Sequence, residues 1–253
     1  MRRFLQIVGG LLLALVLVVV GAGVATFGGL PPIPDGQDVA GVARVVKDGY
    51  VAAFVLDIGD GKVALVDAGS DPAAGALLAE LTRRGLGPDA VTDILLTHGH
   101  ADHTAGIKQF PAAIVHALGT EVPLVEGRAS GHGPLTRWIP AKDQGIRVTD
   151  PLQDGARVTI GTRTAEVFAI PGHTAGSAGW LVDGVLFLGD SADATKEGTL
   201  LGAKYIFTDD AAQNHASLLA LSERLAPRRA TVKAVACAHT GVLEGGDALF
   251  AFR

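Results

Sequence analysis

After residue 39 the chain is a series of short apolar runs separated by glycine-rich turns, a pattern typical of β-strands. Residues 51–58 and 62–66 are two such runs, and the Gly-Asp-Gly sequence between them predicts a hairpin turn. Further runs predict strands at residues 91–96, 112–116, 157–160, 164–170, 178–182, 185–188 and 232–237.

Two longer segments have the sequence features of helices. Residues 71–86 begin with Asp71 as a candidate N-cap and a proline at the first helical position, and glycines follow the end. A second helix is expected after Asp210, and it stops before Pro227 because proline cannot continue a helix. The leucines of this second helix suggest one buried face: Leu218, Leu219, Leu221 and Leu225.

The order of strands, a helix and a strand occurs twice along the chain. Because sheets and helices bury their apolar faces against each other, two such halves facing one another predict a four-layer αββα sandwich of the mixed α/β class. Ligand sites in such an arrangement lie at strand ends where the halves meet. We therefore expect one folded catalytic domain over residues 39–253.

Residues 1–30 have the pattern of a membrane anchor or a secretory signal. Arg2 and Arg3 precede an uncharged stretch, in which residues 7–25 are almost wholly Leu, Val, Ala and Gly. That length suits a membrane-spanning helix, with the positive charges in the cytoplasm and the folded domain outside it. Cleavage near Ala25, which would give a secreted or periplasmic protein, is the alternative. Residues 31–38 are expected to form a proline-rich tether.

Composition excludes some classes of function. The chain has 253 residues, a net charge of −5 and 48% hydrophobic residues, enough for a packed core. A nucleic-acid surface would need clustered Lys and Arg, so no nucleic-acid partner is expected. Cys237 is the only cysteine, so no intramolecular disulfide can form. The oligomeric state stays open.

The strongest candidate for chemistry is residues 97–103, Thr-His-Gly-His-Ala-Asp-His, directly after a predicted strand. In extended backbone alternate side chains point the same way, so His98 and His100 can bind one cation together. Asp102 and His103, at the start of a short helix, point to a second position beside the first. Divalent ions such as Zn²⁺ accept imidazole and carboxylate ligands, and an open coordination position can activate water. The motif therefore predicts a two-metal centre with hydrolytic chemistry.

Three further metal-capable residues follow predicted strands in the second half of the chain. His173 lies in the sequence Pro-Gly-His-Thr-Ala-Gly-Ser, Asp190 follows a Leu-Gly pair, and His239 follows residues 232–238. With the first cluster they give seven candidate ligands: His98, His100, Asp102, His103, His173, Asp190 and His239.

This order of motifs resembles the metallo-β-lactamase-fold superfamily over roughly residues 40–245. The resemblance rests on His-x-His-x-Asp-His, then Gly-His-Thr-x-Gly-Ser, then Gly-Asp and a late His-Thr-Gly. Asp67, in Leu-Val-Asp-Ala-Gly, matches the family's early aspartate, which would support the metal loop without binding metal. The resemblance implies two ligand sets and a bridge: His98, His100 and His173 for one metal, Asp102, His103 and His239 for the other, and Asp190 between them.

The implied activity is hydrolysis by a di-zinc enzyme. Two cations would share a water, lower its pKa and hold the hydroxide for attack on a carbonyl or phosphoryl centre. Asp102 or Asp190 could then pass a proton to the leaving group. Asp190 stands where the commonest subclass of zinc β-lactamases has cysteine, and only residues 240–253 follow the last ligand, where hydroxyacylglutathione hydrolases carry a helical substrate domain. A small ester, lactone or thioester is therefore the expected substrate.

Two other functions stay open from the sequence. Iron or manganese suits the same ligands, so an iron-dependent oxidoreductase of the persulfide dioxygenase type is the first alternative. A protein that binds metal without catalysis is the second.

Several other residues are weighed as lesser candidates. The Gly- and Pro-rich residues 119–143 are expected to form an irregular flap over the site, with His132 and Trp138 as possible substrate contacts. Tyr205 is a candidate hydrogen-bond donor to substrate. The rest are expected to be structural or solvent-exposed: His116, His215 and Cys237.

Overall fold

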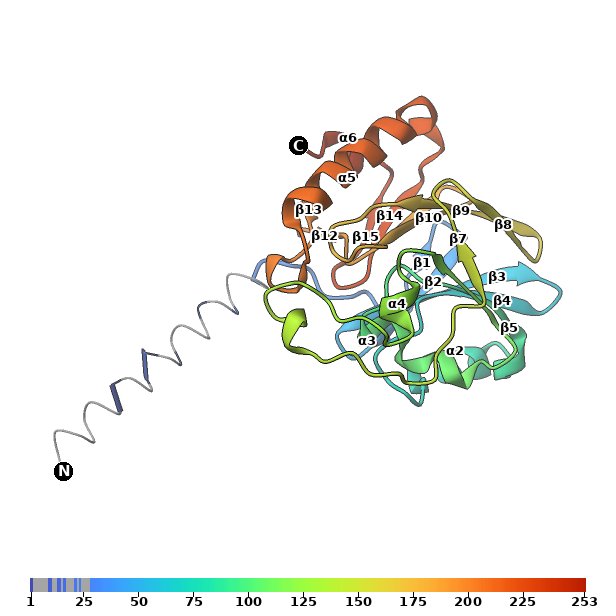
Figure 1. Ribbon diagram of the computed structural model, residues 1–253. Coiled ribbons are helices and arrows are strands. Elements are labelled where there is room, and N and C mark those ends of the chain that lie inside the picture. The colour runs from blue at the N-terminus through green and yellow to red at the C-terminus, as the bar shows by residue number, and fades with distance from the viewer. Residues whose placement is uncertain (2–8, 11–12, 15, 17–20, 22, 24–27) are drawn as a thin grey trace. The chain divides into compact units, whose positions relative to one another are not determined.

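Figure 1 shows the computed structural model, which describes residue 1, residues 9–10, 13–14, 16, 21 and 23, and residues 28–253. The chain divides into two units, Met1–Leu30 and Pro31–Arg253. The expected anchor or signal at residues 1–30 falls largely on residues outside this description. None of the helices within the described ranges combines the length and the hydropathy that a membrane span requires.

The larger unit contains two large β-sheets and a two-stranded one in the part of the chain that the structure describes (Figure 1). In the described residues the first sheet has the strand order β1-β2-β3-β4-β5-β6-β7. Strands β1 to β4 pair antiparallel, and β4 to β7 pair parallel. Their bounds are β1 Asp38–Val39, β2 Ala43–Asp48, β3 Val51–Gly59, β4 Lys62–Val66, β5 Val91–Leu95, β6 Ile114–Leu118 and β7 Asp150–Leu152.

The second sheet has the order β15-β14-β11-β10-β9-β8. Strands β8 to β11 pair antiparallel, β14 lies parallel to β11, and β15 returns antiparallel. Strands β12 and β13 form a separate antiparallel pair. The bounds are β8 Arg157–Ile160, β9 Arg163–Ala169, β10 Ala178–Val182, β11 Val185–Gly189, β12 Ala192–Ala194, β13 Leu200–Gly202, β14 Ala234–Cys237 and β15 Gly241–Glu244.

Helices cover the outer face of each sheet, which gives the predicted four layers. The alternation of β3 shows how this arises, because Phe54 and Leu56 enter the core between the sheets while Val55 enters the core on the α2 side. Helix α5 buries Leu218 and Leu221 against the second sheet. The helices are α2 Gly75–Arg83, α3 Ala101–Thr104, α4 Val122–Val125, α5 Ala211–Leu225 and α6 Asp247–Ala251.

The helix predicted at residues 71–86 is shorter, and the assignment of Asp71 as its N-cap is wrong. Ala74, in the left-handed conformation, precedes the first residue of α2. The Asp71 carboxylate instead accepts hydrogen bonds from the amides of Ala73 and Gly75, both at 2.9 Å. Aspartate readily closes such a turn with its own side chain, so the helix starts later. By contrast, Asp210 is the N-cap of α5, because its side chain accepts from the Gln213 amide.

Three segments outside the predicted strands and helices are also structured. The segment at residues 119–143 is not wholly irregular, since it contains α4 and a short 3₁₀ turn at Thr136–Trp138. Residues 240–253, which follow the last candidate ligand, form β15 and α6. The proline-rich segment begins the folded unit: Ile33 is buried, and the Gly36 amide donates to the Val45 carbonyl at 2.9 Å.

Trp180 of β10 joins the two sheets behind the candidate site. It is fully buried in the core between the sheets, and its Nε1 donates to the Leu96 carbonyl at 2.9 Å. Leu96 directly precedes residues 97–103, so this contact ties the second sheet to the first candidate metal loop.

We therefore expect Trp180→Phe to lower the free energy of unfolding by about 2–4 kcal/mol, because it leaves a buried carbonyl without its donor and removes packed volume. Urea denaturation followed by far-UV circular dichroism measures this change. Trp138→Phe is the matched control, since Trp138 is 79% exposed, and should shift the value by less than about 0.5 kcal/mol. A Trp180 variant as stable as the parent would contradict the assignment.

Candidate metal centre

Strand β5 positions the first group of candidate ligands. Its buried apolar residues end at Leu95, and the following loop carries His98 and His100 before α3 begins at Ala101. Asp102 lies in the first turn of α3. The predicted order of strand, histidine loop and short helix is confirmed.

Three strands of the second sheet position the other group. His173 follows β9, Asp190 follows β11, and His239 follows β14. Strands β11 and β14 are parallel, and β9 runs in the same direction because β10 is antiparallel to both β9 and β11. The carboxyl ends of all three strands therefore meet at one edge of the sheet.

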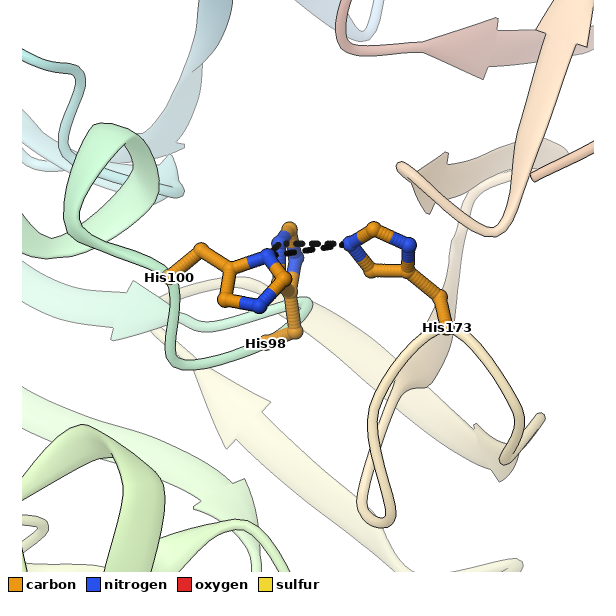
Figure 2. A group of neighbouring side chains, drawn as sticks. All are labelled: His98, His100 and His173. Carbon is orange, nitrogen blue, oxygen red and sulfur yellow. Dashed lines mark hydrogen bonds between the residues drawn. The ribbon is translucent and has the colours of Figure 1, made fainter. Parts of the chain in front are cut away.

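His98, His100 and His173 converge from these two groups, as Figure 2 shows. Their facing nitrogens are His98 Nε2, His100 Nδ1 and His173 Nε2, and the three separations are 3.1, 3.2 and 3.1 Å. Nitrogens bound to one tetrahedral zinc at about 2.0–2.1 Å lie about 3.3 Å apart. The triangle therefore has the size that such an ion requires.

The tautomer of His98 follows from its hydrogen-bond partners. The Thr97 hydroxyl donates to Asp67 Oδ2 at 2.7 Å, so its oxygen is left to accept from His98 Nδ1–H at 3.1 Å. His98 Nε2 then carries a lone pair that points into the triangle.

The tautomer of His173 follows from its hydrogen-bond partners in the same way. The Thr208 hydroxyl donates to the Lys204 carbonyl at 2.7 Å and accepts from His173 Nδ1–H at 3.3 Å. His173 Nε2 and His98 Nε2 thus present lone pairs to each other at 3.2 Å. Two lone pairs repel at this distance, whereas a cation between them would bind both.

The second group is centred on Asp190. Asp190 Oδ1 lies 3.1 Å from His103 Nε2, and its Oδ2 lies 3.0 Å from His239 Nε2 and 3.7 Å from His173 Nε2. Asp102 Oδ2 lies 3.7 Å from His103 Nε2 and 3.6 Å from His239 Nε2. Asp190 therefore faces candidate ligands of both groups.

Two buried atoms of this group lack an aligned hydrogen-bond partner. They are His103 Nε2 and Asp190 Oδ1, which approach closely but not in hydrogen-bonding geometry. His103 Nδ1 already donates to Asp67 Oδ2 at 2.8 Å, and His239 Nδ1 donates to the Tyr50 carbonyl at 2.7 Å. The Nε2 atoms of both histidines therefore face the carboxylates, and His239 Nε2 lies within hydrogen-bond distance of Asp190 Oδ2. Imidazole nitrogens and carboxylate oxygens together are the donor set of a divalent ion.

The two groups differ in their electrostatics. Burial lowers the pKa of His98 well below its usual value and the pKa of His173 to about 3, so both stay neutral. Burial acts in the same direction on His103, but the carboxylates of Asp190, Asp102 and Asp67 raise its pKa well above the usual value. Burial opposes ionisation of Asp190, yet His239 and His103 hold its pKa well below the usual value.

The two sheets approach each other very closely at this edge. Gly189, the residue before Asp190, has a φ of 55°, and a Cβ added there would lie 2.3 Å from Thr97 Oγ1. Only glycine fits both the backbone conformation and the space. Asp190 can therefore reach the histidine loop because residue 189 has no side chain.

Comparison with known proteins agrees with this geometry. The family model of the metallo-beta-lactamase superfamily matches residues 46–239, more than half of the chain. The chain belongs to the metallo-beta-lactamase superfamily. The resemblance noted in the sequence is thereby confirmed.

Individual relatives of this superfamily member carry hydrolase names. The chain is 34% identical over 158 residues to a hydroxyacylglutathione hydrolase of Fuscovulum blasticum, covering 61% of this chain and 52% of the relative. It is 38% identical over 149 residues to that of Anaeromyxobacter dehalogenans, covering 58% and 48%. The chain thus spans about half the length of these curated relatives. Their names agree with the predicted hydrolase class.

Solved metallo-beta-lactamases share the fold. A B3 metallo-beta-lactamase with an active-site glutamic acid superimposes with a TM-score of 0.66 at 22% identity, covering 88% of this chain and 87% of that chain. At this level of identity the likeness shows the fold alone.

The lesser candidates of the sequence do not belong to the three groups of candidate ligands. His132 is exposed, as are Trp138 at 79% and Tyr205 at 69%. His116 is buried between Asp93 and Asp150, whose carboxylates lie 2.9 and 2.8 Å from its two ring nitrogens. His215 lies against Phe252, and Cys237 is a buried thiol whose pKa burial raises. Structural roles therefore suit His116 and Cys237, as expected.

Sequence reasoning missed the residues that orient the ligands. Thr97 and Thr208 assign the histidine tautomers, and the Tyr50 carbonyl holds His239. Thr97 stands inside the motif and could have been found there. The other two come from distant loops, and nothing in the linear sequence marks them.

Asp67 is expected to act on both groups at once, because it accepts from the Thr97 amide and hydroxyl and from His103 Nδ1–H. Asp67→Asn exchanges one acceptor oxygen for a donor, so zinc affinity should fall about 10–100-fold. Competition with a chromophoric chelator measures it. Asp57→Asn, at an exposed carboxylate that accepts from the Gly59 amide, is the control and should keep the parent affinity. Equal affinities of the two variants would contradict this role for Asp67.

Proposed function

We propose that this chain is a metal-dependent hydrolase that uses two divalent ions, zinc first, on a small ester, thioester or lactone. One observation carries the proposal. Seven side chains from both halves of the fold converge into three overlapping groups, each with its donor atoms within 4.8 Å: His98, His100 and His173; His98, His103 and Asp190; Asp102, His103 and His239.

The residues present fit two ions. His98, His100 and His173 would hold one with the three facing nitrogens described above. Asp102, His103 and His239 would hold the other, and Asp190 would bridge. When bound, two such ions lower the pKa of water and stabilise negative charge on the electrophile.

The geometry suggests different roles for the two aspartates. Both Asp190 oxygens face imidazole nitrogens, and the low pKa of its carboxyl keeps it ionised, which suits a bridging ligand. Asp102 is the more exposed of the two, at 20% against 13% of the side chain, and only one of its oxygens faces the histidines. We therefore infer that Asp102 is the residue that passes a proton toward the leaving group.

The mouth of the site offers contacts for a small organic substrate. The Tyr50 ring stacks on His239 with an interplanar angle of 8°, and the side chain is largely exposed. Burial, Asp102 and Asp190 raise the pKa of Tyr50, so its hydroxyl stays a hydrogen-bond donor at neutral pH. The relatives' name, hydroxyacylglutathione hydrolase, makes an acyl-glutathione thioester the first substrate to test.

Protein purified without added metal is expected to contain about two zinc ions per chain by elemental analysis. It should hydrolyse at least one of an acyl-glutathione thioester, a lactone and an aryl ester, with a phosphodiester and a penicillin as comparisons. Chelation should abolish turnover, and zinc should restore it. Iron together with oxygen consumption would instead indicate an oxidoreductase, and metal without any turnover would indicate a binding protein.

Two variants test the separate roles of Asp190 and Asp102. Asp190→Ala should lose turnover by about 10²-fold or more together with part of the metal, because the ligand between the two groups is gone. Asp102→Asn should lose turnover while it retains more metal than Asp190→Ala. Full activity of Asp190→Ala with normal metal content would reject its bridging role.

We also propose that residues 1–30 anchor the protein in a membrane, with the catalytic unit outside the cytoplasm. The support is in the sequence, where Arg2 and Arg3 precede an uncharged apolar stretch, and the folded unit begins at Pro31.

The full chain is expected to sediment with membranes and to require detergent for release, because an apolar helix of this length inserts stably. Residues 31–253 alone should be soluble and still bind metal. A mass that corresponds to cleavage near Ala25 would favour the exported form. Recovery of the uncleaved full chain in the soluble fraction would contradict the anchor.

A further inference from the structure

Glu121 is a buried carboxylate that neither the predicted ligand set nor the proposed mechanism uses. It is 1% exposed and stands directly before the first residue of α4. Burial of an ionised carboxylate costs free energy unless strong donors surround it. Its hydrogen-bond partners are therefore informative.

The two oxygens of Glu121 bind two different metal loops. Oε1 accepts from the Gly99 amide at 2.7 Å, and Oε2 accepts from the Gly176 amide at 2.7 Å. Gly99 lies between His98 and His100, whereas Gly176 belongs to the loop of His173. One carboxylate thus joins the loops that carry all three nitrogens of the His98, His100 and His173 group.

The backbone around these contacts is packed too closely for other side chains. A Cβ added at Gly99 would lie 2.8 Å from the Val125 amide nitrogen, and one added at Gly176 would lie 2.4 Å from the Glu121 nitrogen. The first turn of α4 therefore rests directly on both loops. A change in the Glu121 side chain would be transmitted to both.

Other hydrogen bonds also hold each of these two loops. The histidine loop is held to the second sheet by the Ala178 amide, which donates to the Thr97 carbonyl at 2.8 Å. The His173 loop is closed on itself by Ser177, whose hydroxyl accepts from the Thr174 amide at 2.9 Å. Glu121 adds a separate link between the two loops, from Gly99 to Gly176.

We propose that Glu121 is a positioning residue that sets the separation between the His98–His100 loop and the His173 loop, and thereby the metal affinity of the three-histidine position. The inference rests on the proposed function only in taking these histidines as metal ligands. It does not depend on which substrate, if any, is hydrolysed.

Glu121→Gln is the decisive variant, because a carboxamide has one acceptor oxygen and places its NH₂ group against the other backbone amide. Either orientation releases one loop. Zinc affinity of the folded protein, measured by competition with a chromophoric chelator, should fall about 10–100-fold. Thermal unfolding of the metal-free protein is measured in parallel, so that only folded protein enters the comparison.

Glu126→Gln is the matched control. Glu126 follows the last residue of α4, and its carboxylate accepts from the Val148 amide and the Arg128 side chain, which belong to neither metal loop. It should keep the parent zinc affinity. A Glu121→Gln protein that is less stable but binds zinc with parent affinity would overturn the proposal, because Glu121 would then act only on the fold. Lowered affinity in a protein without hydrolytic activity would support the proposal and reject the function.

If Glu121→Gln does not fold, the parent protein decides the question. Hydrogen exchange of the Gly99 and Gly176 amides is measured before and after zinc is added. Positioning by Glu121 predicts that both amides are protected already in metal-free protein and that zinc leaves their protection unchanged. Amides that exchange freely until zinc is present would overturn the proposal, because the metal and not Glu121 would then order the loops.

Discussion

The nitrogen atoms His98 Nε2 and His173 Nε2 lie 3.2 Å apart, and the lone pairs on both face each other. The surrounding contacts hold the two rings in this position. Nitrogens that both carry lone pairs cannot hydrogen-bond to each other, and burial lowers the pKa of both rings, so protonation does not relieve the contact. A cation satisfies both, together with His100 Nδ1. The three facing nitrogens thus form the donor set that an ion requires.

The packing of the fold offsets the unfavourable free energy of holding these histidine nitrogens close together. The core between the two sheets brings the end of β5 against the ends of β9, β11 and β14. Trp180 donates across the sheets to Leu96, Gly189 allows the close approach at Thr97, and Asp67 holds both Thr97 and His103. Strain at a functional site of this kind persists because the surrounding structure determines it from several directions. Asp67 itself has a φ of 59°.

Many of the strands and the histidine motif could be predicted from the sequence, because local residue types and a periodic apolar pattern mark them. The apolar run at residues 62–66 coincides with β4, and the residues at 157–160 and 178–182 coincide with β8 and β10. The histidine motif follows a strand as expected. Strands such as β2 could not be recognised, because Arg44 and Lys47 interrupt the apolar pattern.

The contacts that were not predicted link residues far apart in the chain. Glu121 binds amides 22 and 55 residues away, and the Tyr50 carbonyl accepts from His239 across 189 residues. Such partners depend on the tertiary fold and leave no periodic signal. The seven candidate ligands were found because metal chemistry restricts residue types, whereas a backbone carbonyl or a buried glutamate can come from any loop.

Crystals of zinc-loaded protein, examined by anomalous diffraction at the zinc edge, test the central claim most directly. We expect one peak about 2.0–2.1 Å from His98 Nε2, His100 Nδ1 and His173 Nε2, and a second peak about 3.5–4 Å away beside Asp102, His103 and His239. A zinc-loaded crystal without a peak inside the histidine triangle would contradict it.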